Sequence, residues 1–334
     1  MLRILHNTHI DFIRLWKLAA GIMVVFLVPA LFLIPIQGFN YSIEFTGGTA
    51  LRLKFQQAPN LGDVRSTLSQ RGIQGAEIVT FGAPEEIMVR AQQSEQVASQ
   101  AAGATTVADR IRQALDARYG PGSYEVQRTE AVSPRIGSEL RGQATIALLI
   151  AFALTLIYLA WRFEWRFSVA AVLATVHDII ATLAFMKYMN LEISVFVVGA
   201  ILTVIGYSMN DKVVVFDRVR ENLKSARRES LYDLLNRSVN ETLPRTVMTG
   251  STTLACLLAL LIFGGEVIRP FAWIMTFGII IGTFSSIYVA SPILLWIERK
   301  FPRDPGSKTH ISASQARAEP KPERKEPRPS PALR

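Results

Sequence analysis

Six long apolar segments limit what this chain can fold into more than any other feature of its sequence. Each is long enough to cross the hydrocarbon core of a bilayer as a helix. A protein folded in water would not gather its hydrophobic residues, which make up 50% of the chain, into segments of this length. The sequence therefore predicts an α-helical polytopic membrane protein with six transmembrane helices. The segments are residues 18–36, 142–161, 167–186, 193–216, 246–263 and 271–297.

Lysine and arginine are concentrated in alternate connections, which predicts the orientation of the chain in its membrane. The N-terminal segment, the loops after the second and fourth spans, and the segment after the last span are basic, whereas the other short loops carry one cation each. Both termini are therefore expected in the cytoplasm. The net charge of +9 is expected to lie against anionic membrane lipids, and no nucleic-acid partner is expected.

Residues 37–141 have the size and patterning of a folded domain outside the membrane. Val107, Ile111 and Leu115 fall on one face of an expected helix. The expected element order, β-α-β-β-α-β, is that of a small α+β ferredoxin-like fold. The expected strands are 41–55, 76–82, 86–91 and 124–132, and the expected helices are 61–71 and 96–118.

The spans and this domain divide the chain into five expected parts. Residues 298–334 are basic and rich in proline and serine, and so few of them are apolar that the segment is expected to be disordered. The parts are a cytoplasmic N-terminal segment 1–17, a first transmembrane helix 18–36, the outer domain 37–141, a five-helix transmembrane bundle 142–297 and a disordered basic cytoplasmic tail 298–334.

Asp211 is the most informative single residue, because it lies inside the fourth apolar segment. A carboxylate that faced lipid there would cost several kcal/mol, about 2.5–3.5 on insertion scales. Asp211 is therefore expected to face protein or a water-filled cavity, and it is a candidate for moving a proton or an ion. The alternative is that it only pairs with Lys212 or Arg245 near the cytoplasmic interface. Gly206 and Asn210 lie beside it on a small and polar helix face that suits close helix contact.

Three further ionisable residues could contribute to such a relay. His177 and Asp178 lie near the middle of the third span, deeper than Asp211, and histidine is a natural proton carrier near neutral pH. The alternative for this pair is a structural hydrogen bond that locks helices together. Arg245 follows Pro244 at the start of the fifth span, near the depth of Asp211. It could alternately pair with Asp211 and release it, or it could be an ordinary anchor at the interface.

The sequence gives no sign of nucleotide hydrolysis, of metal binding or of an enzyme active site. The paired glycines 47 and 48 lack the following lysine and hydroxyl residue of a phosphate-binding loop, and there is no zinc pattern. No cofactor and no metal site are therefore expected. Energy for any transport is expected to come from an ion gradient or from a partner protein.

Four motifs together resemble the SecD/SecF family of bacterial protein-export membrane proteins, which belongs to the RND transporter superfamily. The resemblance covers nearly the whole chain except the tail. It rests on Phe45-Thr46-Gly47-Gly48-Thr49, on His177-Asp178, on the run from Gly206 to Arg218 that contains Asp211 and Asp217, and on Glu241-Thr242-Leu243-Pro244-Arg245-Thr246. Apart from the family, the paired glycines predict a bulge or a close backbone approach in the first outer strand.

This resemblance implies a location in the bacterial inner membrane, a periplasmic position for the outer domain and an RND-like arrangement of the helices. It also implies a heterodimer with SecD, association with the SecYEG channel and the SecA motor, and help to preprotein export driven by the proton-motive force. Asp211 corresponds to the family's ion-relay carboxylate, with Arg245 as a supporting cation and with Asp178, His177 and Asn210 secondary. The alternatives are an RND-type exporter of small molecules or lipids, and a passive scaffold of the export channel.

Overall fold

The computed structural model describes residues 8–73, 75–91, 103–225 and 229–302. Six stretches of helix within these ranges are long and apolar enough to cross a membrane, which confirms the predicted class. The segments 1–7, 92–102 and 303–334, which include part of the expected helix 96–118 and most of the expected tail, lie outside the described residues.

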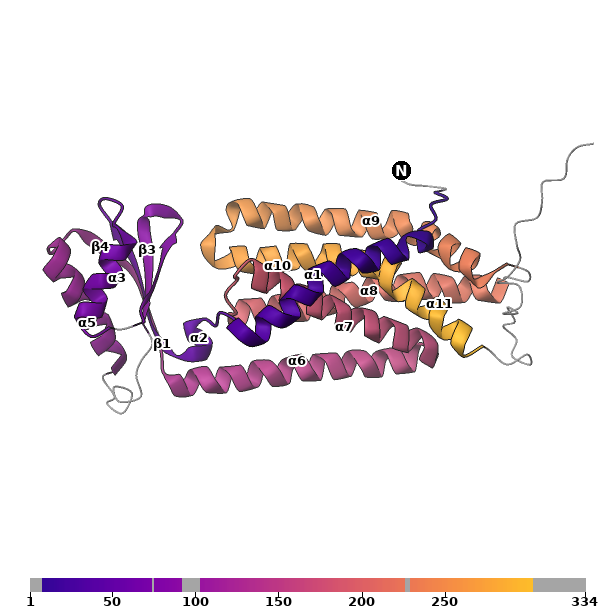
Figure 1. The fold of residues 1–334 in the computed structure, drawn as a ribbon, viewed down its shortest axis with the longest axis horizontal. Coiled ribbons are helices and arrows are strands. Elements are labelled where there is room, and N and C mark those ends of the chain that lie inside the picture. The colour runs from indigo at the N-terminus through magenta and orange to yellow at the C-terminus, as the bar shows by residue number, and fades with distance from the viewer. Residues whose placement is uncertain (1–7, 74, 92–102, 226–228, 303–334) are drawn as a thin grey trace, which may run out of the picture.

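The spans form one bundle, and the small sheet domain lies beyond one end of it (Figure 1). The last span is interrupted: α10 continues through one π-helical turn, η2, into α11. The other spans are single helices, of which α1 follows the short 3-10 turn η1 at Ile13–Leu15. The bounds are α1 Trp16–Gln37, α6 Pro134–Arg162, α7 Trp165–Tyr188, α8 Val195–Ser225, α9 Leu231–Phe263, α10 Gly265–Ser285, η2 Ser286–Ala290 and α11 Ser291–Lys300.

Two helices begin well before the apolar segments that predicted them, because polar caps start them. Ser133 accepts a hydrogen bond from the backbone of Ile136, and Pro134 occupies the first turn of α6. Ser230 caps α9 in the same way through the backbone of Asp233. Helix α9 then continues through Pro244, which the sequence had placed at the start of the fifth span.

The sheet domain has the predicted ferredoxin-like topology. Its strands have the order β2-β3-β1-β4, and every neighbouring pair is antiparallel. Leu51 and Leu53 of β1 point to the same side as Ile87 and Val89 of β3, and all four are fully buried against α3 and α5. These two helices cover the face of the sheet that is turned away from the bundle (Figure 1). The bounds are β1 Gly48–Phe55, α3 Leu61–Gln70, β2 Glu77–Phe81, β3 Ala83–Ala91, α5 Gly103–Tyr119 and β4 Tyr124–Val132.

The first strand begins at Gly48, so the prediction of a strand from residue 41 was wrong. Residues Ile43–Thr46 instead form one helical turn, α2, and Gly47 follows it with a φ of +73°. A Cβ on Gly47 would lie 2.6 Å from the Cα atom of Pro134. The predicted close backbone approach is therefore present, and it occurs between the motif and the start of α6 rather than within the sheet.

The glycine motif joins the sheet domain to the membrane helices through several polar contacts. Arg141 of α6 donates a hydrogen bond of 2.8 Å to the carbonyl oxygen of Phe45, whose side chain is buried. The carboxylate of Glu44 accepts one of 2.7 Å from the backbone nitrogen of Val195, the first residue of α8. An ion pair between Arg90 of β3 and Glu192 adds a second link to the loop before α8. Thr46 and Thr49 complete the motif: Thr46 caps its own turn through the carbonyl of Ser42, and Thr49 is fully buried in β1.

The close approach at this joint leaves no room for a side chain at Gly137 of α6. A Cβ on Gly137 of α6 would lie 2.9 Å from the backbone nitrogen of Gly47, whereas a Cβ on Gly142, five residues further along the same helix, meets no atom within 4 Å. We expect Gly137→Ala to lower the free energy of unfolding by about 1–3 kcal/mol through overpacking. Gly142→Ala should be neutral or stabilising by up to about 1 kcal/mol. Thermal unfolding of the purified variants measures both, and equal effects would contradict this account of the joint.

Candidate functional site

Two buried carboxylates lie in the centre of the helix bundle, on neighbouring helices. Asp178 of α7 is 1% exposed and Asp211 of α8 is 2% exposed. Helix α10 packs against both of these helices. The two carboxylates have different surroundings, and this difference determines what each can do chemically.

Asp178 is surrounded by donors. One carboxylate oxygen accepts a hydrogen bond of 2.6 Å from the ammonium of Lys212, one of 2.7 Å from the hydroxyl of Ser285, and a third from the hydroxyl of Ser208. The other oxygen lies 3.0 Å from Nδ1 of His177. Lys212 is completely buried, so this is an ion pair inside the bundle between α7 and α8. The pair links α7 to α8, and removal of either partner alone would leave a buried charge uncompensated.

Asp211 has no such set of partners. Its carboxylate accepts one side-chain hydrogen bond, of 3.1 Å, from the hydroxyl of Thr283 on α10. Within the described residues, no lysine or arginine nitrogen lies inside the 4.0 Å limit for an ion pair with it. Lys212 is its neighbour in sequence but pairs with Asp178 instead. Asp211 is therefore a carboxylate that is shielded from water without a counter-ion in contact.

Two glycines of α10 bring these groups together. A Cβ on Gly278 would lie 2.2 Å from the side chain of Val204, and one on Gly282 would lie 3.0 Å from Cβ of Ser208. The Gly-x-x-x-Gly pattern therefore allows α10 to contact α8 closely, as expected for such spacing. This close contact is what places Thr283 beside Asp211 and Ser285 beside Asp178.

Arg245 and Asn210 do not join the buried groups. Both side chains are exposed, and both line a cavity of about 680 Å³ near the ends of α8 and α9. The structure thus brings together His177, Asp178 and Lys212, and it leaves Asp211 and Arg245 separated.

The small and polar face of α8 is uncovered. Thr203, Gly206 and Asn210 are exposed, and a Cβ on Gly199 or on Gly206 would meet no atom within 4 Å. The opposite side of the same helix carries Ser208, Asp211 and Lys212, all buried. Helix α8 therefore presents its charged groups to the bundle and its smallest residues to the outside.

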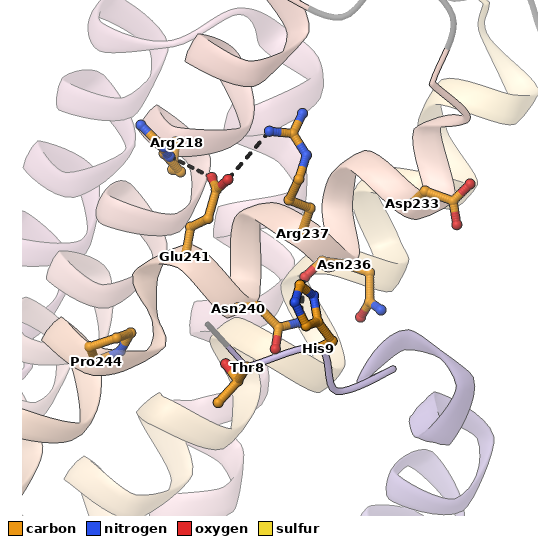
Figure 2. Close-up of a pocket in the computed structure, with 9 residues that line it drawn as sticks. All are labelled: Thr8, His9, Arg218, Asp233, Asn236, Arg237, Asn240, Glu241 and Pro244. Atoms are coloured by element: carbon orange, nitrogen blue, oxygen red, sulfur yellow. Dashed lines mark hydrogen bonds and ion pairs between the residues drawn. The ribbon is translucent and has the colours of Figure 1, made fainter. Parts of the chain in front are cut away.

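Charged residues near the end of α8 form ion pairs that connect helices. Asp217 accepts two hydrogen bonds, of 2.8 and 2.6 Å, from Arg162 of α6. Arg218 donates one of 2.6 Å to Glu241 of α9, which also pairs with Arg237 (Figure 2). The pocket in that view has a volume of about 520 Å³ and is lined on one side by Thr8 and His9, and the side chain of Asn240 donates to the carbonyl of Ile10. Asp217 and Arg218 therefore hold the helix ends together.

Sequence reasoning did not identify the partners of the two carboxylates. Lys212, Ser208, Ser285 and Thr283 were not predicted as site residues, although a lysine inside an apolar segment is as costly as an aspartate and needs a partner. That cost was the available signal for Lys212. The three hydroxyl residues carry no comparable signal, since serine and threonine are common in membrane helices.

The different surroundings predict different costs of neutralising each carboxylate. Asp178→Asn would leave the ammonium of Lys212 buried without a counter-charge, so we expect a loss of about 3–5 kcal/mol in the free energy of unfolding. Asp211→Asn keeps an oxygen that can accept from Thr283, so a change below about 1 kcal/mol is expected. Thermal unfolding in detergent compares the two purified variants. A larger loss for Asp211→Asn than for Asp178→Asn would refute the assignment of Asp178 as the locked group.

Comparison with known proteins identifies relatives over most of the chain. Residues 111–300 match the family model "Protein export membrane protein SecD/SecF, C-terminal", and residues 32–59 match the SecD/SecF GG motif. The protein translocase subunit SecF of Gemmatimonas aurantiaca is 54% identical over 91% of this chain and 91% of its own length. The SecF subunit of Desulfurispirillum indicum is 43% identical over 86% of this chain and 91% of its own length.

Solved structures resemble the fold as well. The crystal structure of SecDF from Thermus thermophilus, described as a translocon-associated membrane protein, matches with a TM-score of 0.77 and 35% sequence identity over 89% of this chain. A second SecDF crystal structure, in a super-membrane-facing form, matches with a TM-score of 0.64 and 36% identity over 88% of the chain. The chain spans 40% of the length of each of these SecDF chains.

Proposed function

We propose that this chain, which belongs to the SecD/SecF family of protein-export membrane proteins, is an accessory subunit of the Sec translocase that couples the proton-motive force to late steps of protein export. The observation that carries this proposal is Asp211: a carboxylate inside a membrane-spanning helix, 2% exposed, with one hydroxyl as its side-chain partner within the described residues. Such a group can exchange a proton without breaking an ion pair.

The contrast with Asp178 supports Asp211 as the relay. Protonation of Asp178 would leave the ammonium of Lys212 buried in the bundle without a counter-charge, which costs several kcal/mol. Protonation of Asp211 removes an unpaired buried charge. In choosing the relay residue, we therefore give the contacts of Asp178 more weight than its deeper position in the membrane. We assign His177 and Asp178 a structural role.

Arg245 and Asn210 provide the access side of this relay in our proposal. Both line the cavity of about 680 Å³ at the ends of α8 and α9. A rearrangement that brings the guanidinium of Arg245 toward Asp211 would favour the ionised carboxylate and expel its proton. One charge that crosses 100 mV supplies about 2.3 kcal/mol, which biases a conformational equilibrium roughly fifty-fold.

Helix α8 connects proton exchange at Asp211 to the sheet domain. It carries Asp211 in its membrane part, and its first backbone nitrogen is held by Glu44 of the glycine motif. A tilt of α8 would therefore pull on the motif and on β1, which follows it directly. We propose that the sheet domain swings in response and grips or releases preprotein on the outer side of the membrane.

The uncovered face of α8 is the proposed contact with SecD. Its small and polar residues would gain close packing and polar partners from a second helix, and lipid offers neither. SecDF chains that combine this fold with a longer sequence are consistent with such a partner. We also propose association with SecYEG and SecA, which the family membership supports.

The proposed location is the bacterial inner membrane with both termini in the cytoplasm. The basic residues at the ends of α6, α8 and α11 lie at the same end of the bundle, away from the sheet domain (Figure 1), as expected of a cytoplasmic end. Fusions of a reporter enzyme that is active only outside the membrane, made at Gln100 and at Ser225, distinguish the two orientations.

Two other functions make different predictions. An RND-type exporter of small molecules or lipids would move its substrate without SecYEG. A passive scaffold would not need the carboxylate of Asp211. Both are separated from the proposed function by measuring preprotein export.

We expect Asp211→Asn to abolish the stimulation of preprotein export by a proton gradient, because the amide cannot exchange a proton. Inverted membrane vesicles that contain the full translocase measure this, with and without an uncoupler. Protein level and complex assembly should be unchanged. Thr283→Val is the matched control, since it removes the hydroxyl but keeps the carboxylate, and it should retain part of the stimulation. Normal gradient-stimulated export by Asp211→Asn would favour the scaffold.

Cysteine crosslinking tests the interface. Because the native Cys256 is exposed, it is first replaced by serine. We expect cysteines at Gly199 and Gly206 to crosslink to co-expressed SecD, because this face of α8 is uncovered. A cysteine at Val25, which is 75% exposed on α1, serves as the control and should not crosslink. Crosslinking from Val25 but from neither position on α8 would refute the arrangement.

A further inference from the structure

We propose that the ammonium of Lys212 is the built-in occupant of a monovalent-cation site, formed by Asp178 and Ser208, that accepts free Na⁺ or K⁺ when the lysine side chain is removed. The proposal concerns binding to this chain alone and does not rest on the proposed role in export.

The oxygens around the ammonium accept from all of its donors. The nitrogen lies 2.6 Å from a carboxylate oxygen of Asp178 and 3.3 Å from the backbone carbonyl oxygen of Ser208, and it also contacts the hydroxyl of Ser208. An ammonium group has three hydrogens to donate, so these three acceptors satisfy it. Ser285 supports the site from α10, where its hydroxyl donates 2.7 Å to the same carboxylate oxygen.

These ligands are of the kind that bind alkali cations. Carboxylate, hydroxyl and backbone carbonyl oxygens are the ligands that hard cations prefer. An alkali ion carries the same single charge as the ammonium and takes oxygen ligands at similar distances. The site therefore offers a free cation the charge and the ligands that it now offers to Lys212.

Within the part of the chain that the structure describes, the site is also buried away from water and from other lysine and arginine side chains that could neutralise Asp178. Lys212, Ser208 and Ser285 are 0% exposed and Asp178 is 1% exposed. His177 lies 3.0 Å from the other carboxylate oxygen, and Asp211 is the neighbour of Lys212 in sequence. Among the described residues, Lys212 is the one lysine or arginine within ion-pair distance of Asp178. Without Lys212, a proton or a free cation would have to neutralise the carboxylate.

The backbone next to the site is irregular in a way that often marks functional positions. Ser285 is the last residue of α10, and the π-helical turn Ser286–Ala290 follows it directly. Such turns change the register of the side chains and occur frequently at functional sites. The helix that supplies Ser285 is thus locally reshaped at the point where it meets Asp178.

The native chain should consequently be insensitive to the choice of alkali cation, because its own ammonium fills the site. Lys212→Ala opens the space while leaving the carboxylate in place. Lys212→Met removes the same charge but keeps the space filled, and is the matched control. The double variant Asp178→Asn/Lys212→Ala opens the space and removes the charge that would hold a cation.

The experiment is thermal unfolding of the purified full chain and these variants in NaCl, KCl or choline chloride at equal ionic strength and pH. We expect Lys212→Ala to gain about 3 °C or more in Tm in NaCl or KCl over choline chloride, because a ligand that binds only the folded state raises Tm. The native chain, Lys212→Met and the double variant should show no such difference. Recovery of folded Lys212→Ala only when Na⁺ or K⁺ is present throughout purification would equally support the proposal.

Several outcomes would overturn it. One is a folded Lys212→Ala protein whose Tm is the same in all three salts, or rises only on acidification, since a proton then takes the place of the ammonium. Another is an equal response in Lys212→Met or in the double variant. Failure of Lys212→Ala to fold in any of the three salts would also count against a site that accepts a free cation, whether or not the double variant folds.

Discussion

The buried ion pair between Asp178 and Lys212 is the interaction on which the rest of the bundle depends. It joins α7 to α8 in the interior, where neither charge could remain alone, and Ser285 extends it to α10. Because this pair consumes the only cation close to Asp211 in sequence, Asp211 remains without a counter-ion in contact. Because Lys212 pairs with Asp178 and not with Asp211, Asp178 is neutralised and Asp211 is left without a counter-ion in contact among the described residues.

The same helix connects the chemistry to the sheet domain. The glycines of α10 allow close contact with α8, which places Thr283 and Ser285 against the two carboxylates. At its other end, α8 is capped by Glu44 of the glycine motif. The motif is therefore best understood as a joint: its glycines allow backbone contact with α6, and its polar groups secure α8. Helix α8 therefore links the proposed proton exchange at Asp211 to the proposed movement of the sheet domain.

Much of the fold could be predicted from the sequence, because apolar length and strand alternation are local signals. These signals identified the six spans and the ferredoxin-like order of elements. The cost of a charge in lipid predicted that Asp211 faces protein or a cavity, and the residue is 2% exposed. These signals failed where a local sequence pattern is compatible with two structures. Residues 41–47 have the composition of a strand but turn before Gly48 because of their contact with α6. Lys212 could have paired with Asp211 or with Asp178, and only the packing of α7 on α8 decides between them.

The central claim is that Asp211 exchanges a proton while Asp178 keeps its charge. Infrared difference spectra of the reconstituted protein, recorded between neutral and acidic pH, detect the absorption of a carboxyl group that becomes protonated. We predict that Asp211→Asn loses such a band, and that the double variant Asp178→Asn/Lys212→Met, which removes both charges of the locked pair, retains it. Loss of the band in the double variant, with an unchanged band in Asp211→Asn, would contradict the account.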